Sequence, residues 1–298
     1  MSDPTRTPDP RSPLLDRAAI RRHFDLASAG YDESAVLAGR LRDQMITRLD
    51  WTAFVPDSIL DLGCGTGPGA AALATRWPHA RVVALDASPA MLRKVARRDA
   101  AGRIELLCAT AEAMPLPDAS FDLVFSNLML PWCEDIDAVF AEVARVLRPR
   151  GLFTFTSFGP DTLMELRAAW ATVDGGAHVH PFTDMHDLGD GLVRAGLTEA
   201  VLDVSRYTLT YPDVGTLMRD LKAIGAQNAA GSRLRGLTGR RRLAAMAEAY
   251  EPFRADGTLP ATHEVVFGQA WGAMDSPERG GRGQGEVIVP IRDIRRRN

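Results

Sequence analysis

A glycine-rich segment that carries a carboxylate is the part of this sequence best suited to chemistry. It reads Ile59-Leu60-Asp61-Leu62-Gly63-Cys64-Gly65-Thr66-Gly67, and its first half is a short apolar run. Glycines let a backbone approach a ligand closely where a Cβ would clash. In an open α/β sheet, ligands bind at the carboxyl ends of the strands. The segment therefore predicts a ligand site, in preference to a tight turn that binds nothing.

Two ligand classes fit these glycines. Gly65, Gly67 and Ala70 satisfy the dinucleotide pattern G-x-G-x-x-A, which is a weak signal by itself. Asp61 lies two positions before Gly63, where its carboxylate would repel a pyrophosphate and attract a cationic group. The position of Asp61 therefore favours a ligand with a cationic end.

A second carboxylate, Asp86, ends the next apolar run. At that position a carboxylate can accept hydrogen bonds from two ribose hydroxyls, as it does in NAD enzymes. Asp86 therefore predicts a nucleoside without identifying it. Its alternative role is to cap the next helix, although Ser88 suits that role better.

Short apolar runs alternate with segments of helical spacing through the middle of the chain. The expected strands are 58–62, 81–85, 104–108, 121–126 and 151–157, and the expected helices between them are 67–76, 88–98 and 136–147. Runs that are apolar on both faces are typical of parallel strands, and their alternation with helices predicts a doubly wound α/β sheet.

The flanking segments complete the expected domain, which spans residues 14–272. Helices are expected in two pieces within 14–50 and at 185–195, 214–225 and 240–250, and late strands at 201–211 and 262–271. The helical stretch at 212–255 lies between the late strands, so we expect it to form a lid over the ligand edge of the sheet. Residues 1–13 are expected to be a disordered leader and residues 273–298 a disordered tail.

Composition narrows the possible partners. The 298 residues are 46% hydrophobic with a formal net charge of −3, and no run of about 18 apolar residues occurs. Nucleic acids and anionic membranes attract excess positive charge, so neither is expected as a partner. Three scattered cysteines predict neither a disulfide framework nor a metal site. A cytoplasmic protein is expected.

The pattern D-x-G-x-G-x-G from Asp61 to Gly67 resembles motif I of class I S-adenosylmethionine-dependent methyltransferases, whose cofactor carries an ammonium and a sulfonium. The resemblance continues through Asp86 and the fourth strand, and it implies a Rossmann-like, mostly parallel seven-stranded sheet with helices on both faces. Thr110 stands where the family usually has an aspartate that binds adenine. The cofactor contacts implied are Asp61, Gly63, Cys64, Gly65, Gly67, Asp86, Ala87, Met91, Thr110, Ala111, Glu112, Asn127 and Leu128.

More specific motifs lie outside this core. They are Phe24–Asp32, Ser126–Cys133, Ser157–Arg167, Phe182–Asp190, Asp220–Asn228 and Leu259–Gly268. Together they resemble the malonyl-acyl-carrier-protein O-methyltransferases of biotin synthesis (the BioC family) over roughly residues 20–271, with departures at Ala38, Thr110 and Pro131. The resemblance implies methylation of the free carboxylate of a malonyl thioester.

A carboxylate acceptor is already ionised at pH 7, so it needs orientation more than a general base. The family resemblance makes Tyr31 the leading active-site residue, with packing at a helix boundary as the alternative. His186 is a candidate for orienting the substrate, with a helix-surface or core role as the alternative. The remaining substrate-binding candidates are Trp132, Arg219, Lys222 and Arg233.

The implied partner is an acyl carrier protein that bears malonyl-phosphopantetheine. Carrier proteins are acidic, so Arg240-Arg241-Arg242 or Arg21-Arg22 are candidate docking sites, and we expect a monomeric enzyme. Three alternatives stay open at this point. They are another carboxyl or small-molecule methyltransferase, a protein arginine hydroxylase related to complex I assembly factors that share two of the segments, and a non-catalytic cofactor-binding scaffold.

Overall fold

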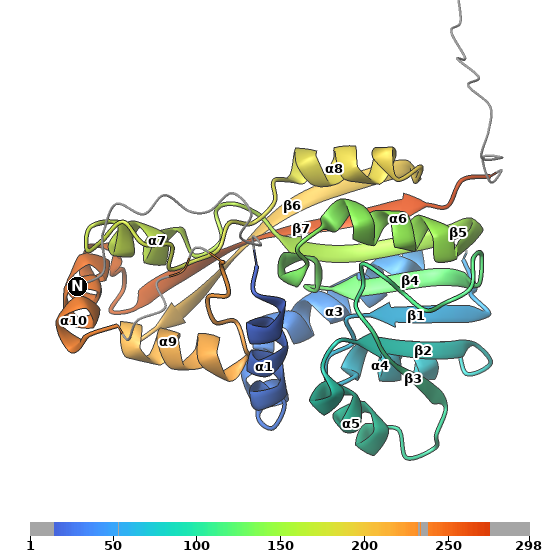
Figure 1. The fold of residues 1–298 in the computed structure, drawn as a ribbon, viewed down its shortest axis with the longest axis horizontal. Coiled ribbons are helices and arrows are strands. Elements are labelled where there is room, and N and C mark those ends of the chain that lie inside the picture. Colours follow the sequence, from blue (N-terminus) through green and yellow to red (C-terminus); the bar gives the residue numbers. More distant parts are fainter. Residues whose placement is uncertain (1–14, 53, 232, 234–237, 275–298) are drawn as a thin grey trace, which may run out of the picture.

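A seven-stranded sheet organises the computed structural model, which describes residues 15–52, 54–231, 233 and 238–274 (Figure 1). The strands lie in the order β3-β2-β1-β4-β5-β7-β6. Their bounds are β1 Ser58–Leu62, β2 Arg81–Asp86, β3 Ile104–Cys108, β4 Phe121–Asn127, β5 Leu147–Phe158, β6 Thr198–Tyr211 and β7 Leu259–Trp271. Strands β1 to β5 are parallel and β7 is antiparallel to both neighbours. The predicted mostly parallel sheet is confirmed. The expected leader, and the tail beyond residue 274, lie outside the described residues.

Helices cover both faces of this sheet. Their bounds are α1 Arg17–Ala27, α2 Tyr31–Ser34, α3 Val36–Arg48, α4 Pro68–Arg76, α5 Pro89–Arg98, α6 Ile136–Val146, α7 Met164–Ala171, α8 Met185–Arg194, α9 Val214–Ala223 and α10 Arg240–Tyr250. Apolar side chains of α6 and α8 pack on one face, and those of α3, α4 and α5 pack on the other. None of these helices is both long enough and apolar enough to span a bilayer.

Local sequence signals explain most helix boundaries. Ser88, Asp135 and Asp213 each accept a hydrogen bond from a backbone N–H in the first turn of the following helix. Gly196 follows α8 with φ +83°, a conformation that favours glycine. The sequence analysis did not predict α7, which begins after Leu163 without a side-chain cap and so gives no start signal.

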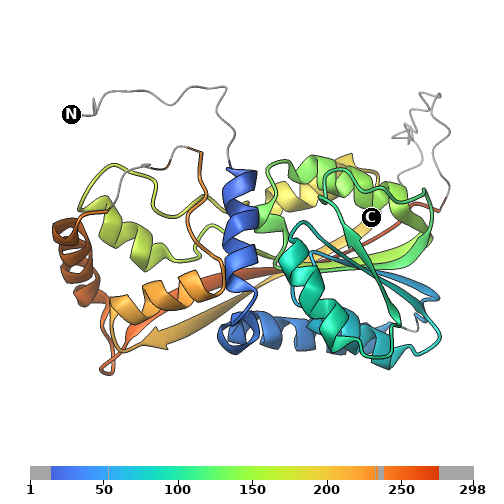
Figure 2. The ribbon, with the colours of Figure 1, turned by 60° about the horizontal axis from the view of Figure 1, so that its bottom comes forward.

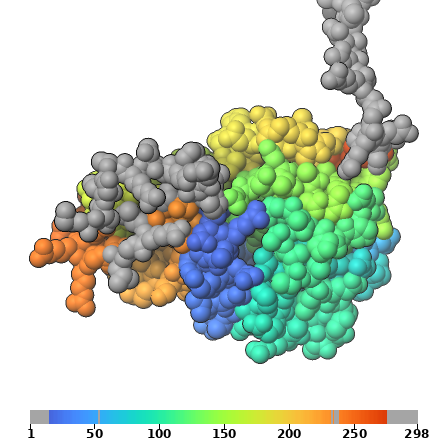
Figure 3. Space-filling view, viewed as in Figure 1, coloured from blue at the N-terminus to red at the C-terminus, as the bar shows by residue number. Residues whose placement is uncertain are grey.

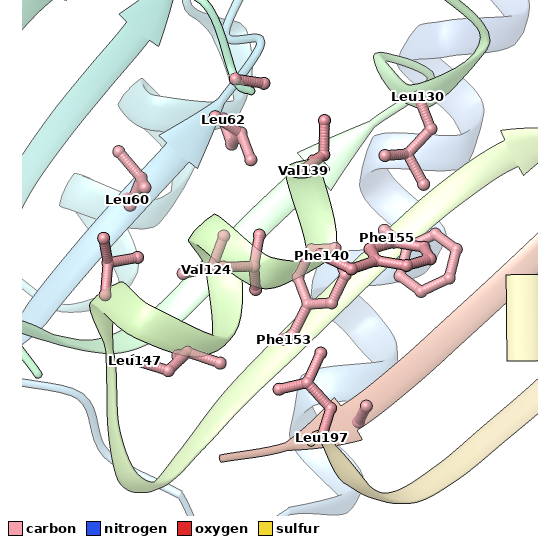
Figure 4. Close-up of a cluster of buried hydrophobic side chains, with 14 of the residues drawn as sticks. Leu60, Leu62, Val124, Leu130, Val139, Phe140, Leu147, Phe153, Phe155 and Leu197 are labelled. Carbon is pink, nitrogen blue, oxygen red and sulfur yellow. The ribbon is translucent and has the colours of Figure 1, made fainter. Parts of the chain in front are cut away.

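The core beneath α6 is filled by aromatic rings from the middle of the sheet (Figure 4). Phe140 from α6 contacts two rings of β5, with centroids 6.0 Å from Phe153 and 5.9 Å from Phe155. Leu60 and Val124 from adjacent strands join the same fully buried cluster. This packing holds β1, β4 and β5 in place beside one another, and the expected ligand site lies at the carboxyl ends of such parallel strands.

Gly268 on β7 tests how tightly this core is filled. A Cβ at this position would lie 2.2 Å from Cζ of Phe155, inside the stacked rings. We expect Gly268→Ala to lower the free energy of unfolding by about 2–3 kcal/mol, measured by chemical denaturation. Gly189→Ala on α8 is the control, because its Cβ would meet only Leu202 at 3.6 Å. Equal stability of both variants would contradict this account.

The long strands β6 and β7 extend past the rest of the sheet and carry α9 and α10 between them in the chain (Figure 1). These helices pack with α7 and the strand extensions in a separate apolar cluster. Helix α1 lies between this extension and α5, as both ribbon views show (Figure 2). In the space-filling view α1 is exposed at the surface between the extension and the rest of the sheet domain (Figure 3). The predicted helical insert is therefore present, and α1 borders it.

Candidate active site

The glycine loop of residues 63–67 connects β1 to α4 and is fastened to the end of β2. The backbone N–H groups of Gly63 and Cys64 donate to the carbonyl oxygen of Leu85, at 2.8 and 3.0 Å. Gly63 has φ +75°, and a Cβ there would lie 2.2 Å from Cγ of Met129. The loop therefore needs glycine both for its conformation and for its close approach to the chain after β4.

Asp86 holds this loop from the carboxyl end of β2. Its Oδ2 accepts a hydrogen bond from the N–H of Gly65 at 2.9 Å, and its Oδ1 accepts one from the N–H of Ser88 at 2.8 Å. Burial raises the pKa of Asp86, and the two backbone N–H groups oppose that rise by stabilising the carboxylate. The carboxylate thus joins the loop to the start of α5 and lines the space beside them.

A cavity of about 540 Å³, here called the large cavity, lies at the carboxyl ends of β1 to β4 and is covered by α1. It brings together most of the predicted cofactor residues with two of the predicted substrate-site residues. The predicted residues that line it are Tyr31, Gly63, Gly65, Asp86, Ala87, Met91, Thr110, Ala111, Glu112, Asn127, Leu128 and Trp132.

A second space of about 280 Å³, here called the loop cavity, lies against the glycine loop and shares Tyr31, Gly63, Gly65 and Asn127 with the large cavity. Asp61 and Cys64 line it. Asp61 is only 2% exposed, and among the described residues its Oδ2 has no hydrogen-bond partner. Burial raises the pKa of Asp61 to about 7. A buried acceptor without a partner fits a cationic ligand group such as an ammonium.

Gly67 differs from the other predicted loop residues because it lines neither cavity. It caps α4 with φ +85°, and a Cβ there would lie 2.8 Å from Cγ2 of Val95 on α5. The structure therefore gives Gly67 a packing role at the helix start, in contrast to the ligand contact expected from the sequence.

A third space of about 60 Å³, here called the aromatic cavity, lies beside the large cavity. Its lining is Phe24, Tyr31, Ser34, Ala35, Leu37, Ala38, Leu128, Trp132, Phe158, Leu209, Tyr211, Asp220, Leu221, Ile224, Ala226 and His263. Among the described residues, Tyr31 is the one that lines all three cavities. Burial, with Asp86 and Asp32 nearby, raises the pKa of Tyr31 to about 12, so its phenol stays protonated at neutral pH.

Ion pairs and hydrogen bonds fasten the N-terminal helices over the large cavity. Arg17 pairs with Glu112 at 3.1 Å and with Glu134 at 3.0 Å. Asp25 accepts a hydrogen bond of 2.6 Å from Oγ of Ser88, beside the Asp86 carboxylate. These contacts place Tyr31, which follows α1, at the junction of the cavities.

The structure does not bring His186 to any of these cavities. It lies at the start of α8 with its side chain 83% exposed, and its Nδ1 is 2.8 Å from Oδ1 of Asp184, the residue that caps the helix. This corrects the expectation that His186 orients the substrate. The cause is that α8 packs against α6 and β6, away from the ligand edge.

The three predicted substrate cations are also absent from the cavity linings. Helix α9 turns Leu217 and Leu221 inward, so Arg219 and Lys222 lie on its exposed side. The guanidinium of Arg233 forms an ion pair of 2.8 Å with Asp16, the residue that caps the start of α1.

Sequence reasoning missed His263 as a site residue. It treated this histidine only as part of a family segment, although alternation along β7 places its side chain on one face with Ala261 and Val265. Asp220 was missed in the same way, although the spacing 217, 220, 221 and 224 was a readable signal for the inner face of α9. Both residues line the aromatic cavity.

The large and loop cavities fit S-adenosylmethionine. Asp86 is placed for a ribose, the apolar surroundings of Met91 and Ala109 suit an adenine, and the partnerless Asp61 Oδ2 suits the ammonium of the methionine end. No cluster of three or more His, Cys, Asp or Glu side chains suited to a metal ion occurs in the described part of the chain.

Comparisons with known proteins agree with this geometry. Residues 60–155 match the family model described as a methyltransferase domain. A malonyl-[acyl-carrier protein] O-methyltransferase of Methylovorus sp. is 49% identical over 87% of this chain and 90% of its own length. The biotin biosynthesis bifunctional protein BioHC of Saccharophagus degradans is 39% identical over 85% of this chain and 46% of its own length.

A solved structure from Bacillus halodurans C-125 superposes with a TM-score of 0.56, covering 78% of this chain and 99% of that chain, at 17% identity. At this identity the likeness concerns the fold alone. Combined with the strand order and the curated relatives, it settles the class of protein. The chain is an S-adenosylmethionine-dependent class I methyltransferase and belongs to the malonyl-[acyl-carrier protein] O-methyltransferase family.

Proposed function

We propose that this enzyme methylates the free carboxylate of a malonyl group held as a thioester on an acyl carrier protein, in the synthesis of the pimeloyl precursor of biotin. The observation that carries the proposal is the position of Tyr31, which lines two cavities suited to the cofactor and also the aromatic cavity, which we assign to the acceptor. Membership of the family supports the choice of acceptor.

The cofactor supplies an electrophilic methyl group on a sulfonium. A carboxylate oxygen of the acceptor forms the new C–O bond while the C–S bond breaks, and the bonding electrons remain on sulfur, so no proton has to move. The residues of this chain contribute alignment and exclusion of water. Tyr31 is a neutral donor that can hold one oxygen of the carboxylate while the other attacks. Phe24 and Trp132, in edge-to-face contact with centroids 5.2 Å apart, close the apolar wall beside it.

The insert between β6 and β7 contributes to the same site. Helix α9 supplies Asp220 and Leu221 to the aromatic cavity, and Ile224 directly after the helix lines it too, which supports the role of this segment as a lid. For the carrier protein we favour Arg21 and Arg22, because both are exposed on α1, which covers the large cavity, and Arg21 lines that cavity. We also propose that the enzyme is a monomer and that it acts in the cytoplasm.

The direct test is to incubate the purified protein with S-adenosylmethionine and malonyl-carrier protein and to measure the mass of the carrier. We expect a gain of one methyl group, and no gain with acetyl-carrier protein, which has no free carboxylate. Binding of the cofactor without this gain would contradict the proposed acceptor and favour another carboxyl or small-molecule methyltransferase.

The proposed place of the cofactor ammonium beside Asp61 predicts a pH dependence. The pKa of Asp61 is about 7 in the free protein, and a nearby cation favours the charged carboxylate. Binding should therefore release a proton near pH 6.5, and the affinity for S-adenosylhomocysteine should fall as the pH drops below 7, by at most about tenfold per unit. Calorimetry in two buffers with different ionisation heats measures this release.

The matched control is Asp61→Asn, which keeps the shape and removes the titration. It should bind S-adenosylhomocysteine without releasing the proton. Proton release that is the same in both proteins would assign the effect to another group. The absence of any release in the unmodified protein would remove Asp61 from the ammonium site.

A further inference from the structure

The aromatic cavity contains one basic side chain among its described lining residues, and that side chain is His263. The rest of its lining is apolar apart from the hydroxyl groups of Tyr31, Ser34 and Tyr211 and the carboxylate of Asp220. The inference drawn from this cavity rests on the proposed function, since it concerns how a malonyl carboxylate is bound.

The size of the cavity suits the reacting end of a malonyl group. Its volume of about 60 Å³ has room for about four to six water-sized groups. A carboxymethyl group has four heavy atoms. The wall shared with the large cavity consists of Phe24, Tyr31, Leu128 and Trp132, so a group bound here would be next to the cofactor space.

His263 lies in the part of the aromatic cavity lining that is not shared with the large cavity. It lies in β7 with 5% of its surface exposed, and its ring lies 5.7 Å from the ring of Phe158. Its Nδ1 is 3.0 Å from the carbonyl oxygen of Ala261, which can only accept, so Nδ1 carries the proton. No hydrogen bond of Nε2 is found within the described part of the chain, and this nitrogen remains for a ligand.

The other polar groups of the cavity are less suited to an anion. The hydroxyl of Tyr211 donates to Oδ2 of Asp220 at 2.7 Å, which occupies both groups. The hydroxyl of Tyr31 supplies one neutral donor. Among the described lining residues of the aromatic cavity, His263 is therefore the one side chain that can offer an anionic oxygen both a hydrogen-bond donor and a positive charge.

We propose that His263 binds the free carboxylate of the acceptor through Nε2 and so distinguishes malonyl thioesters from uncharged acyl thioesters. The bound carboxylate is held by a charged donor on one side and by the Tyr31 phenol as a neutral donor. Methylation removes the negative charge of the acceptor, which weakens this contact and favours release of the ester.

The binding step includes uptake of a proton by Nε2. Burial lowers the pKa of His263, and the negative charges of Glu165 on α7 and Asp220 on α9 oppose that decrease. The other titratable groups in the described lining of the aromatic cavity are the phenols of Tyr31 and Tyr211, which are protonated at neutral pH. A carboxylate ligand adds a further negative charge beside the ring, so protonation accompanies its entry.

The test compares His263→Phe and His263→Gln with the unmodified enzyme. Phenylalanine fills the space without a donor, and we expect it to raise the KM for malonyl-carrier protein about tenfold or more, the loss of one hydrogen bond to a charged group. Glutamine retains an N–H donor and should give a smaller increase. The dissociation constant for S-adenosylhomocysteine should stay within about twofold in both. His79→Phe, at an exposed position before β2, is the matched control.

An unchanged KM in a His263→Phe protein that binds S-adenosylhomocysteine normally would overturn the proposal. A second measurement on the unmodified enzyme covers the case in which the variants do not fold. The ring nitrogens of His263 are followed by NMR in the complex with S-adenosylhomocysteine, and we expect Nε2 to become protonated on adding malonyl-carrier protein but not acetyl-carrier protein. Absence of that change would also overturn it. Failure of the unmodified enzyme to methylate malonyl-carrier protein would instead contradict the proposed function.

Discussion

Asp86→Ala is expected to weaken the binding of S-adenosylhomocysteine about a thousandfold. The carboxylate is placed to accept two ribose hydrogen bonds, and each hydrogen bond to a charged group contributes about 1.5–3 kcal/mol. It also accepts from the N–H of Gly65, so its loss frees the glycine loop on which the cofactor lies. Titration calorimetry or equilibrium dialysis measures the change.

Two further variants make this prediction specific. Asp86→Asn retains an acceptor oxygen and should bind with intermediate affinity. Asp190→Ala, on the exposed side of α8, should bind like the unmodified protein. Affinity reduced less than about tenfold in Asp86→Ala would mean that the ribose is held elsewhere.

Tyr31→Phe is expected to lower kcat for methylation of malonyl-carrier protein by about 10- to 100-fold, with little change in the affinity for S-adenosylhomocysteine. The phenol has no hydrogen-bond partner among the described residues, and it stays protonated because burial raises its pKa to about 12. Removing the hydroxyl deletes the neutral donor that orients the attacking carboxylate, while the ring still fills the junction of the cavities.

Tyr207→Phe is the matched control for this variant. Its hydroxyl donates to Oε1 of Gln44 at 2.6 Å, outside the three cavities, so its removal should affect stability slightly and kcat not at all. If Tyr31→Phe turns over at the normal rate, the residue serves only to pack the helix boundary, which was the alternative interpretation of the sequence.

His186 and His263 show why residue type alone is a poor guide to the proposed acceptor site. His186 was the candidate from the sequence, but it lies at an exposed helix start and contacts the capping residue Asp184. His263 could be placed from the sequence only on one face of β7, and the structure buries it in the lining of the aromatic cavity. The two histidines differ because His263 lies on β7, a strand that borders the aromatic cavity, whereas His186 lies on α8, which does not. Which strands border the cavity follows from the strand order of the sheet.

The substrate cations were misplaced for a similar reason. Helical spacing correctly predicts α9, but the favourable charges Arg219 and Lys222 lie on its solvent side because Leu217 and Leu221 occupy the face that packs inward. Burying a long cation without a partner is costly, so an unpaired arginine is rarely found on the inner face of such a helix.

The sequence by itself determined the doubly wound sheet and the cofactor class, and most of the residues it predicts as cofactor contacts line the large and loop cavities. These depend on short-range signals: apolar runs, caps, and glycines with an acid at a fixed spacing on one strand–helix turn, which fold alike wherever they occur. Only the tertiary structure decided where the aromatic cavity, the proposed acceptor site, lies and which side chains line it. The aromatic cavity is assembled from α1, α2, α3, the segment after β4, β5, β6, α9 and β7, between positions 24 and 263, and no local pattern encodes contacts between elements so distant in the chain.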